Sequence, residues 1–152
     1  MRALICGILV GLALPAVASA HTDAGRQLSF AWPAEGTITS PFGVDGYRWH
    51  PGLDIGILRS LTVRAASPGR VMMTGYIPGY EGYGNLVVLD LGDGYSALYA
   101  HLAQSLVRAG ELLETGQRLG VAGCTGSCTG THLHFELRHR NRAVNPTLLF
   151  AR

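Results

Sequence analysis

Lysine is absent from this chain: its 152 residues include 12 basic side chains, all of them arginine, and 10 acidic ones. The formal net charge is therefore only +2 at pH 7. Proteins that bind nucleic acid or an anionic membrane surface usually carry a larger basic surplus or a basic cluster. We therefore expect neither nucleic acid nor a membrane surface as the partner of the mature protein.

Long hydrophobic runs are also missing, except at the N-terminus. Arg2 precedes an apolar run from Ala3 to about Leu14, and Ala18-Ser19-Ala20 has the small-residue pattern of a cleavage site. The run is too short for a mature membrane-spanning helix. This pattern predicts a secretory signal peptide over residues 1–20, and hence an exported protein. The use of arginine without lysine hints at a GC-rich bacterial genome, and both the periplasm and the cell wall or exterior stay open as locations.

Removal of the signal peptide leaves 132 of the 152 residues, a length that suits one domain with a hydrophobic core. Linker composition rich in proline and serine is lacking, so a second domain is not expected. We divide the mature chain into an N-terminal extension over residues 21–33 and one domain over residues 34–150. We expect this domain to be a monomer.

Cysteine is scarce, with three residues, and one of them, Cys6, lies in the expected signal peptide. Cys124 and Cys128 remain, and an even number of cysteines in an exported chain favours a disulfide. Closing so short a loop would stabilise the fold by roughly 2 kcal/mol on chain-entropy grounds. The alternative is a pair of thiolate metal ligands, although better candidate ligands lie elsewhere.

Sustained helical periodicity is missing after the signal peptide, whereas short strand patterns are frequent. Turn residues separate them: Ser67-Pro68-Gly69 in one place and Gly92-Asp93-Gly94, a strong hairpin signal, in another. Regularly spaced short strands with glycine turns predict an all-β fold, a sandwich or a barrel-like sheet with little helix. The expected strands are "TVRAA", "GRVMMTGYI", "NLVVLDL", "YSALYAHL" and "THLHFELRH".

The segment "THLHFEL" places two of the six histidines on one face of a predicted strand. Side chains alternate between faces with period two, so His132, His134 and Glu136 share one face. The opposite face carries Leu133, Phe135 and Leu137 and is a good core face. A single strand histidine is usually a hydrogen-bonded polar residue, but two on one face indicate a site.

Two other segments offer further ligands or catalytic groups. In "HPGLD", the turn formers Pro51-Gly52 allow His50 and Asp54 to converge, and imidazole and carboxylate are both good zinc ligands. In "YSALYAHL", alternation places His101 on the face of Ala97 and Tyr99, away from an apolar layer formed by Leu98, Ala100 and Leu102.

Together these segments supply five candidates: His50, Asp54, His101, His132 and His134. A catalytic zinc ion needs three protein ligands and one open position. Three of the five residues suffice for the metal, and two remain for proton transfer and transition-state stabilisation. The residue types alone do not assign which three.

The ordered set H-x-x-x-D, H and H-x-H resembles the lysostaphin-type (LytM-type) zinc endopeptidases, which cut bacterial peptidoglycan. The resemblance extends from about Ala34 to Pro146. It includes the segments "GTITSPFG", "VRAASPGRV", "GYGNLVVLDLGDGYSALYAHL", "GQRLGVAG" and "AVNP".

The resemblance implies a secreted zinc metalloendopeptidase with an antiparallel β-sandwich of the duplicated hybrid motif type and a groove over the metal. It implies His50, Asp54 and His134 as ligands of one Zn2+ per chain. It also implies His101 as the general base and His132 as the group that stabilises the oxyanion. Peptidoglycan peptide stems are the implied substrate, and the bond cleaved stays open.

Where the family has a loop of the "TGRSTG" kind before H-x-H, this chain has "CTGSCTG", which we interpret as a staple that stiffens the strand carrying His132 and His134. The glycine-rich loop 79–85 and Tyr47 are further candidates for substrate contact and oxyanion binding. Some family members lose zinc ligands and regulate other wall hydrolases. All five polar positions are present here, which favours an enzyme over such a regulator or a structural zinc domain.

Overall fold

The computed structural model describes residues 30–150, and the expected signal peptide lies outside the described residues. The expected domain boundary at residue 34 stays a prediction. Within residues 30–150, the helices are short 3-10 turns, and neither has the length and hydropathy of a membrane span.

The described chain is almost entirely strand, as the sequence predicts. Thirteen strands and two 3-10 turns are present among the described residues. They are β1 (Thr37–Ser40), β2 (Gly43–Asp45), β3 (Arg48–His50), β4 (Leu53–Gly56), β5 (Thr62–Arg64), β6 (Gly69–Tyr76), η1 (Glu81–Tyr83), β7 (Asn85–Gly92), β8 (Tyr95–Ala100), β9 (Leu102–Ser105), β10 (Leu112–Leu113), β11 (Arg118–Ala122), β12 (Leu133–His139), β13 (Arg142–Val144) and η2 (Pro146–Leu148).

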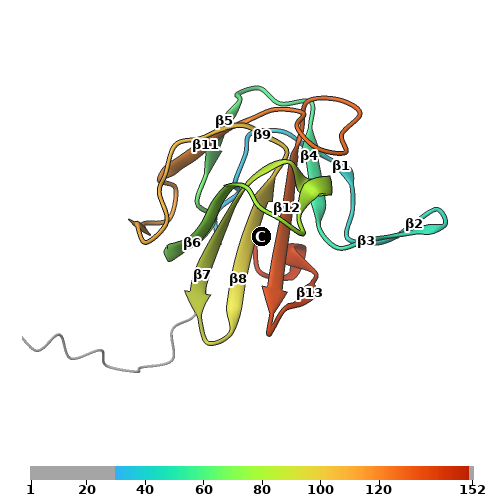
Figure 1. Cartoon of the computed structure of the whole chain (residues 1–152). Coiled ribbons are helices and arrows are strands. Elements are labelled where there is room, and N and C mark those ends of the chain that lie inside the picture. The colour runs from blue at the N-terminus through green and yellow to red at the C-terminus, as the bar shows by residue number, and fades with distance from the viewer. Residues whose placement is uncertain (1–29, 151–152) are drawn as a thin grey trace, which may run out of the picture.

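The strands form one large antiparallel sheet, one small sheet and one hairpin (Figure 1). The large sheet has the order β1-β4-β12-β8-β7-β6-β10, with β13 paired to β12, and the small sheet has the order β5-β11-β9. β12 therefore lies between β4 and β8, although these three strands come from distant parts of the chain. This placement brings the three candidate segments of the sequence side by side.

The core lies between the two sheets and confirms the predicted pattern of β12. Leu133, Phe135 and Leu137 are fully buried there, together with Val63 and Leu119 from the small sheet. The opposite face of β12 carries His134 and Glu136. The apolar face of one strand thus fixes the direction in which its polar side chains point.

The expected face of His101 is wrong. Ala97 and Tyr99 point into the main core, and Leu98 belongs to a second apolar cluster on the other face of the sheet. His101 follows β8 with φ +59°, a left-handed conformation that interrupts the strand alternation. Consequently Leu102 joins the main core instead of the layer of Leu98. The regular period-two pattern could not anticipate this turn.

The β7–β8 hairpin confirms the predicted turn. Asp93 and Gly94 both have positive φ, 52° and 77°. This is the backbone sign pattern of a type I′ turn, whose twist matches the right-handed twist of the flanking strands.

The hairpin β2–β3, which we call the arm, projects from the body of the molecule (Figure 1). Tyr47 lies at its tip and is fully exposed, and Trp49 is 62% exposed. At its base, the ring of Trp49 contacts Phe42 edge-on at a centroid distance of 5.2 Å. The arm leads directly into His50.

The buried hydroxyl of Tyr99 tests the packing of the core. It accepts a hydrogen bond from the backbone N–H of Ala66 at 2.8 Å, and the side chain is fully buried. Tyr99→Phe leaves this N–H without a partner, so we expect the free energy of unfolding to fall by about 1–3 kcal/mol in urea titrations. Tyr95→Phe is the matched control, because the Tyr95 hydroxyl has no hydrogen bond among the described residues. Equal losses in both variants would contradict this account.

Candidate metal centre

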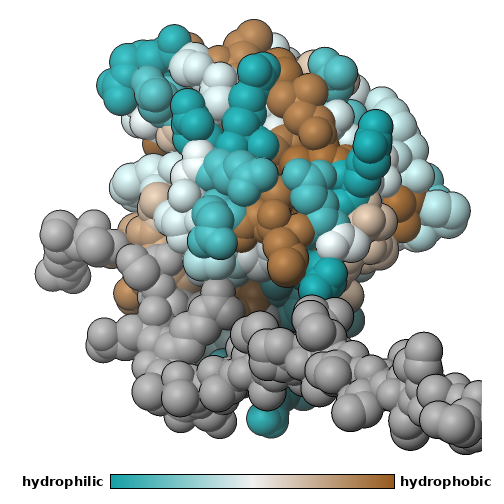
Figure 2. Space-filling view, turned by 90° about the vertical axis from the view of Figure 1, so that its left-hand side faces the viewer, coloured by the Kyte–Doolittle hydropathy of each residue, from teal (hydrophilic) through white to brown (hydrophobic). Residues whose placement is uncertain are grey.

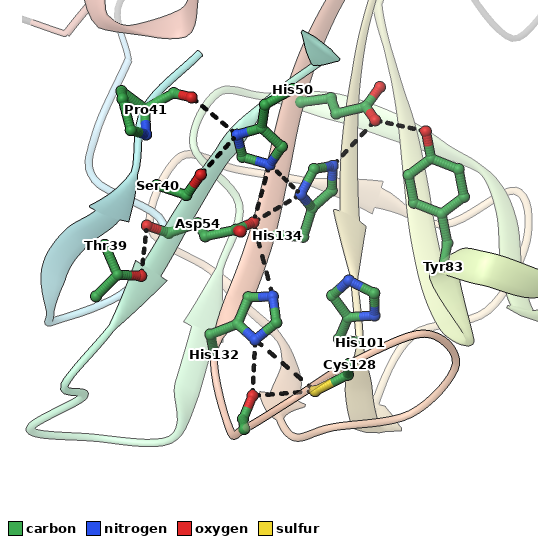
Figure 3. Close-up of polar contacts among 12 residues, drawn as sticks. Thr39, Ser40, Pro41, His50, Asp54, Tyr83, His101, Cys128, His132 and His134 are labelled. Atoms are coloured by element: carbon green, nitrogen blue, oxygen red, sulfur yellow. Dashed lines mark hydrogen bonds and ion pairs between the residues drawn. The ribbon is translucent and has the colours of Figure 1, made fainter. Parts of the chain in front are cut away.

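Three polar side chains converge at one point above β12 (Figure 3). His134 Nδ1 lies 2.8 Å from Asp54 Oδ1, and His50 Nε2 lies 3.2 Å from the same oxygen. The two ring nitrogens are 3.1 Å apart. The structure therefore brings together the three residues that the family resemblance implies as metal ligands.

Sheet register and one glycine produce this convergence. Asp54 on β4 is the direct neighbour of His134 on β12, although 80 residues separate them in the chain. A Cβ atom at Gly52 would lie 2.4 Å from Phe135 O, so only glycine allows the turn after β3 to pass this close to β12. This turn carries His50 from the arm back over Asp54.

Each of the two candidate ligand histidines has its second ring nitrogen engaged outside the cluster. His50 Nδ1 donates to Pro41 O at 2.9 Å, and His134 Nε2 donates to Glu136 Oε1 at 3.0 Å. In the neutral rings these partners assign the protons, so His50 Nε2 and His134 Nδ1 present lone pairs to the cluster; a second proton taken up by either ring would be donated to Asp54. Such outward hydrogen bonds are typical of metal-binding histidines.

The donor set fits a zinc ion. Zinc takes nitrogen and carboxylate oxygen at about 2.0–2.2 Å in a tetrahedron, which separates ligand atoms by roughly 3.4 Å. The three pairwise distances of 2.8, 3.1 and 3.2 Å are close to this spacing. Three acceptor atoms so close together repel one another unless a proton or a cation lies between them.

Local electrostatics favour a positive charge at this point. The hydrogen bond with Asp54 raises the pKa of His50. Burial acts to raise the pKa of Asp54, but hydrogen bonds with His134 and His50 outweigh it and lower that pKa well below its usual range. Burial likewise acts to lower the pKa of His134, and hydrogen bonds with Asp54 and Glu136 raise it overall. Asp54 is thus a stable carboxylate. Together with the ring nitrogens of His50 and His134 that face it, this carboxylate attracts a cation.

His101 and His132 stand beside the cluster, with ring centroids 4.8 Å apart. His101 Nδ1 donates to Thr125 O at 2.8 Å, and His132 Nδ1 donates to Gly130 O at 2.7 Å. Their Nε2 atoms are left for other partners, and that of His132 lies 3.6 Å from Asp54 Oδ1. Burial lowers the pKa of His101, which keeps its ring neutral and able to accept a proton.

All five candidate residues line one cleft of about 380 Å³. Gly82 and Tyr83 also line it, so loop 79–85 borders the site as expected. Tyr47 does not line it, because it stands at the tip of the arm.

Sequence reasoning gave no role to Glu136 or Arg138, and it included Tyr83 only as part of loop 79–85. Glu136 is fully buried and accepts hydrogen bonds from Tyr83 OH and Arg138 Nε, both at 2.6 Å, in addition to that from His134. Burial and the hydrogen bond to Glu136 raise the pKa of Tyr83 to about 12. Glu136 and Arg138 follow His134 at intervals of two on β12, and this alternation was the available signal.

Comparison with known families places the site in context. Residues 48–146 match the profile of Peptidase family M23. The murein hydrolase activator NlpD of Escherichia coli is 35% identical over 118 residues, which cover 78% of this chain and 30% of that protein. The cell division protein DipM of Caulobacter vibrioides is 33% identical over 141 residues, 88% of this chain and 23% of that protein. The chain thus spans a third or less of the length of these relatives.

Solved structures show the same fold. A zinc containing peptidase from Vibrio cholerae superposes with a TM-score of 0.70 at 31% identity, over 83% of this chain and 41% of that one. The antimicrobial peptidase lysostaphin from Staphylococcus simulans gives a TM-score of 0.68 at 28% identity, over 84% and 54%.

The carboxylate of Glu136 is expected to tune metal binding through His134. In Glu136→Gln the hydrogen-bond acceptor of His134 Nε2 loses its charge, so we expect the zinc dissociation constant to rise about 10–100-fold, the usual effect of losing such a partner. Competition with a chromophoric chelator measures this constant. Glu114→Gln is the control: it removes the same charge at an exposed residue outside the strands, and it should bind zinc as the parent does. An unchanged constant in Glu136→Gln would contradict the expectation.

Proposed function

We propose a function on one premise: this chain belongs to peptidase family M23. The proposed function is that of a zinc-dependent endopeptidase that hydrolyses peptide cross-links of bacterial peptidoglycan. One observation carries the proposal. Beside the three converging ligand atoms, the same cleft holds two further histidines whose Nε2 atoms are not engaged by the backbone.

In this proposal His50, Asp54 and His134 hold the zinc ion, one per chain. When bound there, zinc supplies Lewis acidity toward the scissile carbonyl and lowers the pKa of the attacking water. Two imidazoles and one carboxylate leave a net positive charge at the site. The outward hydrogen bonds to Pro41 O and Glu136 hold the two rings in the binding orientation.

The remaining two histidines have separate roles: His101 transfers protons, and His132 stabilises the oxyanion. His101 is neutral, with its proton fixed on Nδ1 by Thr125 O, so its Nε2 accepts the proton of the attacking water. The same nitrogen then returns a proton to the leaving amine. His132, beside the candidate ligands, stabilises the developing oxyanion by a hydrogen bond from its ring.

Relatives support the substrate class. The names of NlpD and lysostaphin connect those proteins with murein hydrolysis and with antimicrobial peptidase activity. We therefore propose peptidoglycan peptide stems as substrate and an exported, bacterial location. The open cleft beside loop 79–85 supports access for an extended peptide.

A second candidate is a regulator of other wall hydrolases, because several relatives are murein hydrolase activators. The presence of all five polar side chains around the cleft supports catalysis instead. A regulator has no need of two histidines beside the ligand set.

Substitution of His101 tests the enzyme proposal. We expect His101→Ala to retain one zinc ion per chain by elemental analysis and to release muropeptides from purified sacculi about 10²–10⁴-fold more slowly, because the general base is lost. His139→Ala is the control, since this histidine stacks on Tyr95 away from the cleft. Mass spectrometry of the released muropeptides identifies the bond cleaved.

Two outcomes would overturn the proposal. Activity of His101→Ala equal to that of the parent would remove His101 from the mechanism. A zinc-loaded parent protein that leaves sacculi intact but stimulates a separate wall hydrolase would instead establish the regulator.

A further inference from the structure

The loop closed by Cys124 and Cys128 lies against both histidines that are not metal ligands. The structure contains the disulfide that the sequence favours, with Cα atoms 5.3 Å apart. The carbonyl that accepts from His101 Nδ1 belongs to Thr125, inside this five-residue ring. The carbonyl that accepts from His132 Nδ1 belongs to Gly130, two residues beyond it. Both contacts are short, 2.8 and 2.7 Å.

The sulfur of Cys128 also packs directly on the second contact. Cys128 Sγ lies 3.0 Å from Gly130 O and 3.8 Å from His132 Nδ1 (Figure 3). The disulfide thus buttresses the hydrogen bond that orients His132.

The side-chain hydroxyl of Thr125 is anchored to the sheet. Its hydroxyl donates to Leu102 O and accepts from Asn85 N, both at 2.9 Å. Ser127 N donates to Gly82 O at 2.9 Å. These bonds connect the ring to the neighbours of His101 and to loop 79–85. They would keep the loop close to the sheet without the disulfide, whereas the disulfide restricts the backbone of the ring that carries the Thr125 carbonyl.

The metal ligands are held by other parts of the chain. His50 is oriented by Pro41 O, and His134 by the buried carboxylate of Glu136. Neither of these partners lies in the stapled loop. The disulfide is therefore placed to affect the two non-ligand histidines without affecting the zinc ligands.

We propose that the Cys124–Cys128 disulfide is a positioning element for His101 and His132. It fixes the carbonyls of Thr125 and Gly130 and so sets the direction of the two Nε2 atoms in the cleft. The catalytic part of this proposal rests on the proposed endopeptidase function. The positioning part can be measured on the zinc-loaded protein without any substrate.

The first experiment compares Cys124→Ser/Cys128→Ser with the parent, both carrying Cys6→Ser so that no other thiol is present. We expect one zinc ion per chain in both. We expect the maximal rate of muropeptide release from saturating sacculi to fall about 10–100-fold, because small misplacement of catalytic groups is costly in rate, while the half-saturating amount of sacculi changes little. If the parent is active and the double serine variant has the same maximal rate, the proposal is overturned.

Imidazole N–H resonances supply the readout that does not depend on activity. In the zinc-loaded parent, the ring protons of all four site histidines should be protected from exchange by their backbone or carboxylate partners. In the serine variant, those of His101 and His132 should exchange rapidly, and those of His50 and His134 should stay protected. Uniform loss of protection would mean a general loss of structure, and uniform retention would mean no positioning role; either result overturns the proposal.

Thr125→Ala supplies a second variant in which the disulfide is intact. It removes the hydroxyl bonds to Leu102 and Asn85, so we expect the resonance of His101 to lose protection and zinc to be retained. Thr125→Ser keeps the hydroxyl and should restore protection. If the parent itself fails to cleave sacculi, the endopeptidase function fails, and these exchange measurements still decide the positioning role.

Discussion

Mutual repulsion of three acceptor atoms is the constraint around which this site is built. His50 Nε2, His134 Nδ1 and Asp54 Oδ1 lie about 3 Å apart, and acceptor atoms at such distances repel one another when no proton or cation lies between them. The surrounding structure holds them there by turning the ring protons outward, toward Pro41 O and Glu136. A proton or a bound cation between these atoms would relieve the repulsion, and this is why the geometry suits a metal ion.

The sequence predicted the parts of the site that depend on local periodicity. The alternation of "THLHFEL" separated the core face of β12 from its polar face, and the structure confirms this for Leu133, Phe135 and His134. Pro51-Gly52 indicated a turn that brings His50 near Asp54. Gly52 indeed lies so close to β12 that a Cβ atom there would be 2.4 Å from Phe135 O. The all-β class followed from the same short-range signals.

Long-range pairing and backbone exceptions could not be predicted in this way. The register that places Asp54 beside His134 is set by sheet packing over 80 residues. The left-handed backbone conformation of His101 places its side chain on the face opposite to the expected one. The prediction failed because nothing in "YSALYAHL" marks such a turn. The role of Glu136 was missed because a carboxylate on the polar face of a strand is usually assumed to be solvated, whereas this one is fully buried and bonded on three sides.

The site has two kinds of support. The candidate metal ligands lie on paired strands of the central sheet and at the base of the arm. The other two histidines depend on carbonyls of a surface loop. Figure 2 shows the molecule from a different side, with apolar and polar residues side by side on its surface. The loop that carries the disulfide is thus separate from the strands that carry the candidate metal ligands.

The projecting arm carries an exposed tryptophan, Trp49, next to the cleft. Only two tryptophans occur in the chain, and Trp32 stacks on Phe150 at a centroid distance of 4.2 Å. Trp49 is 62% exposed, and the next residue along the chain is His50 at the rim of the cleft. The indole of Trp49 is therefore open to solvent beside the cleft, so its fluorescence emission depends on the polarity of its surroundings there.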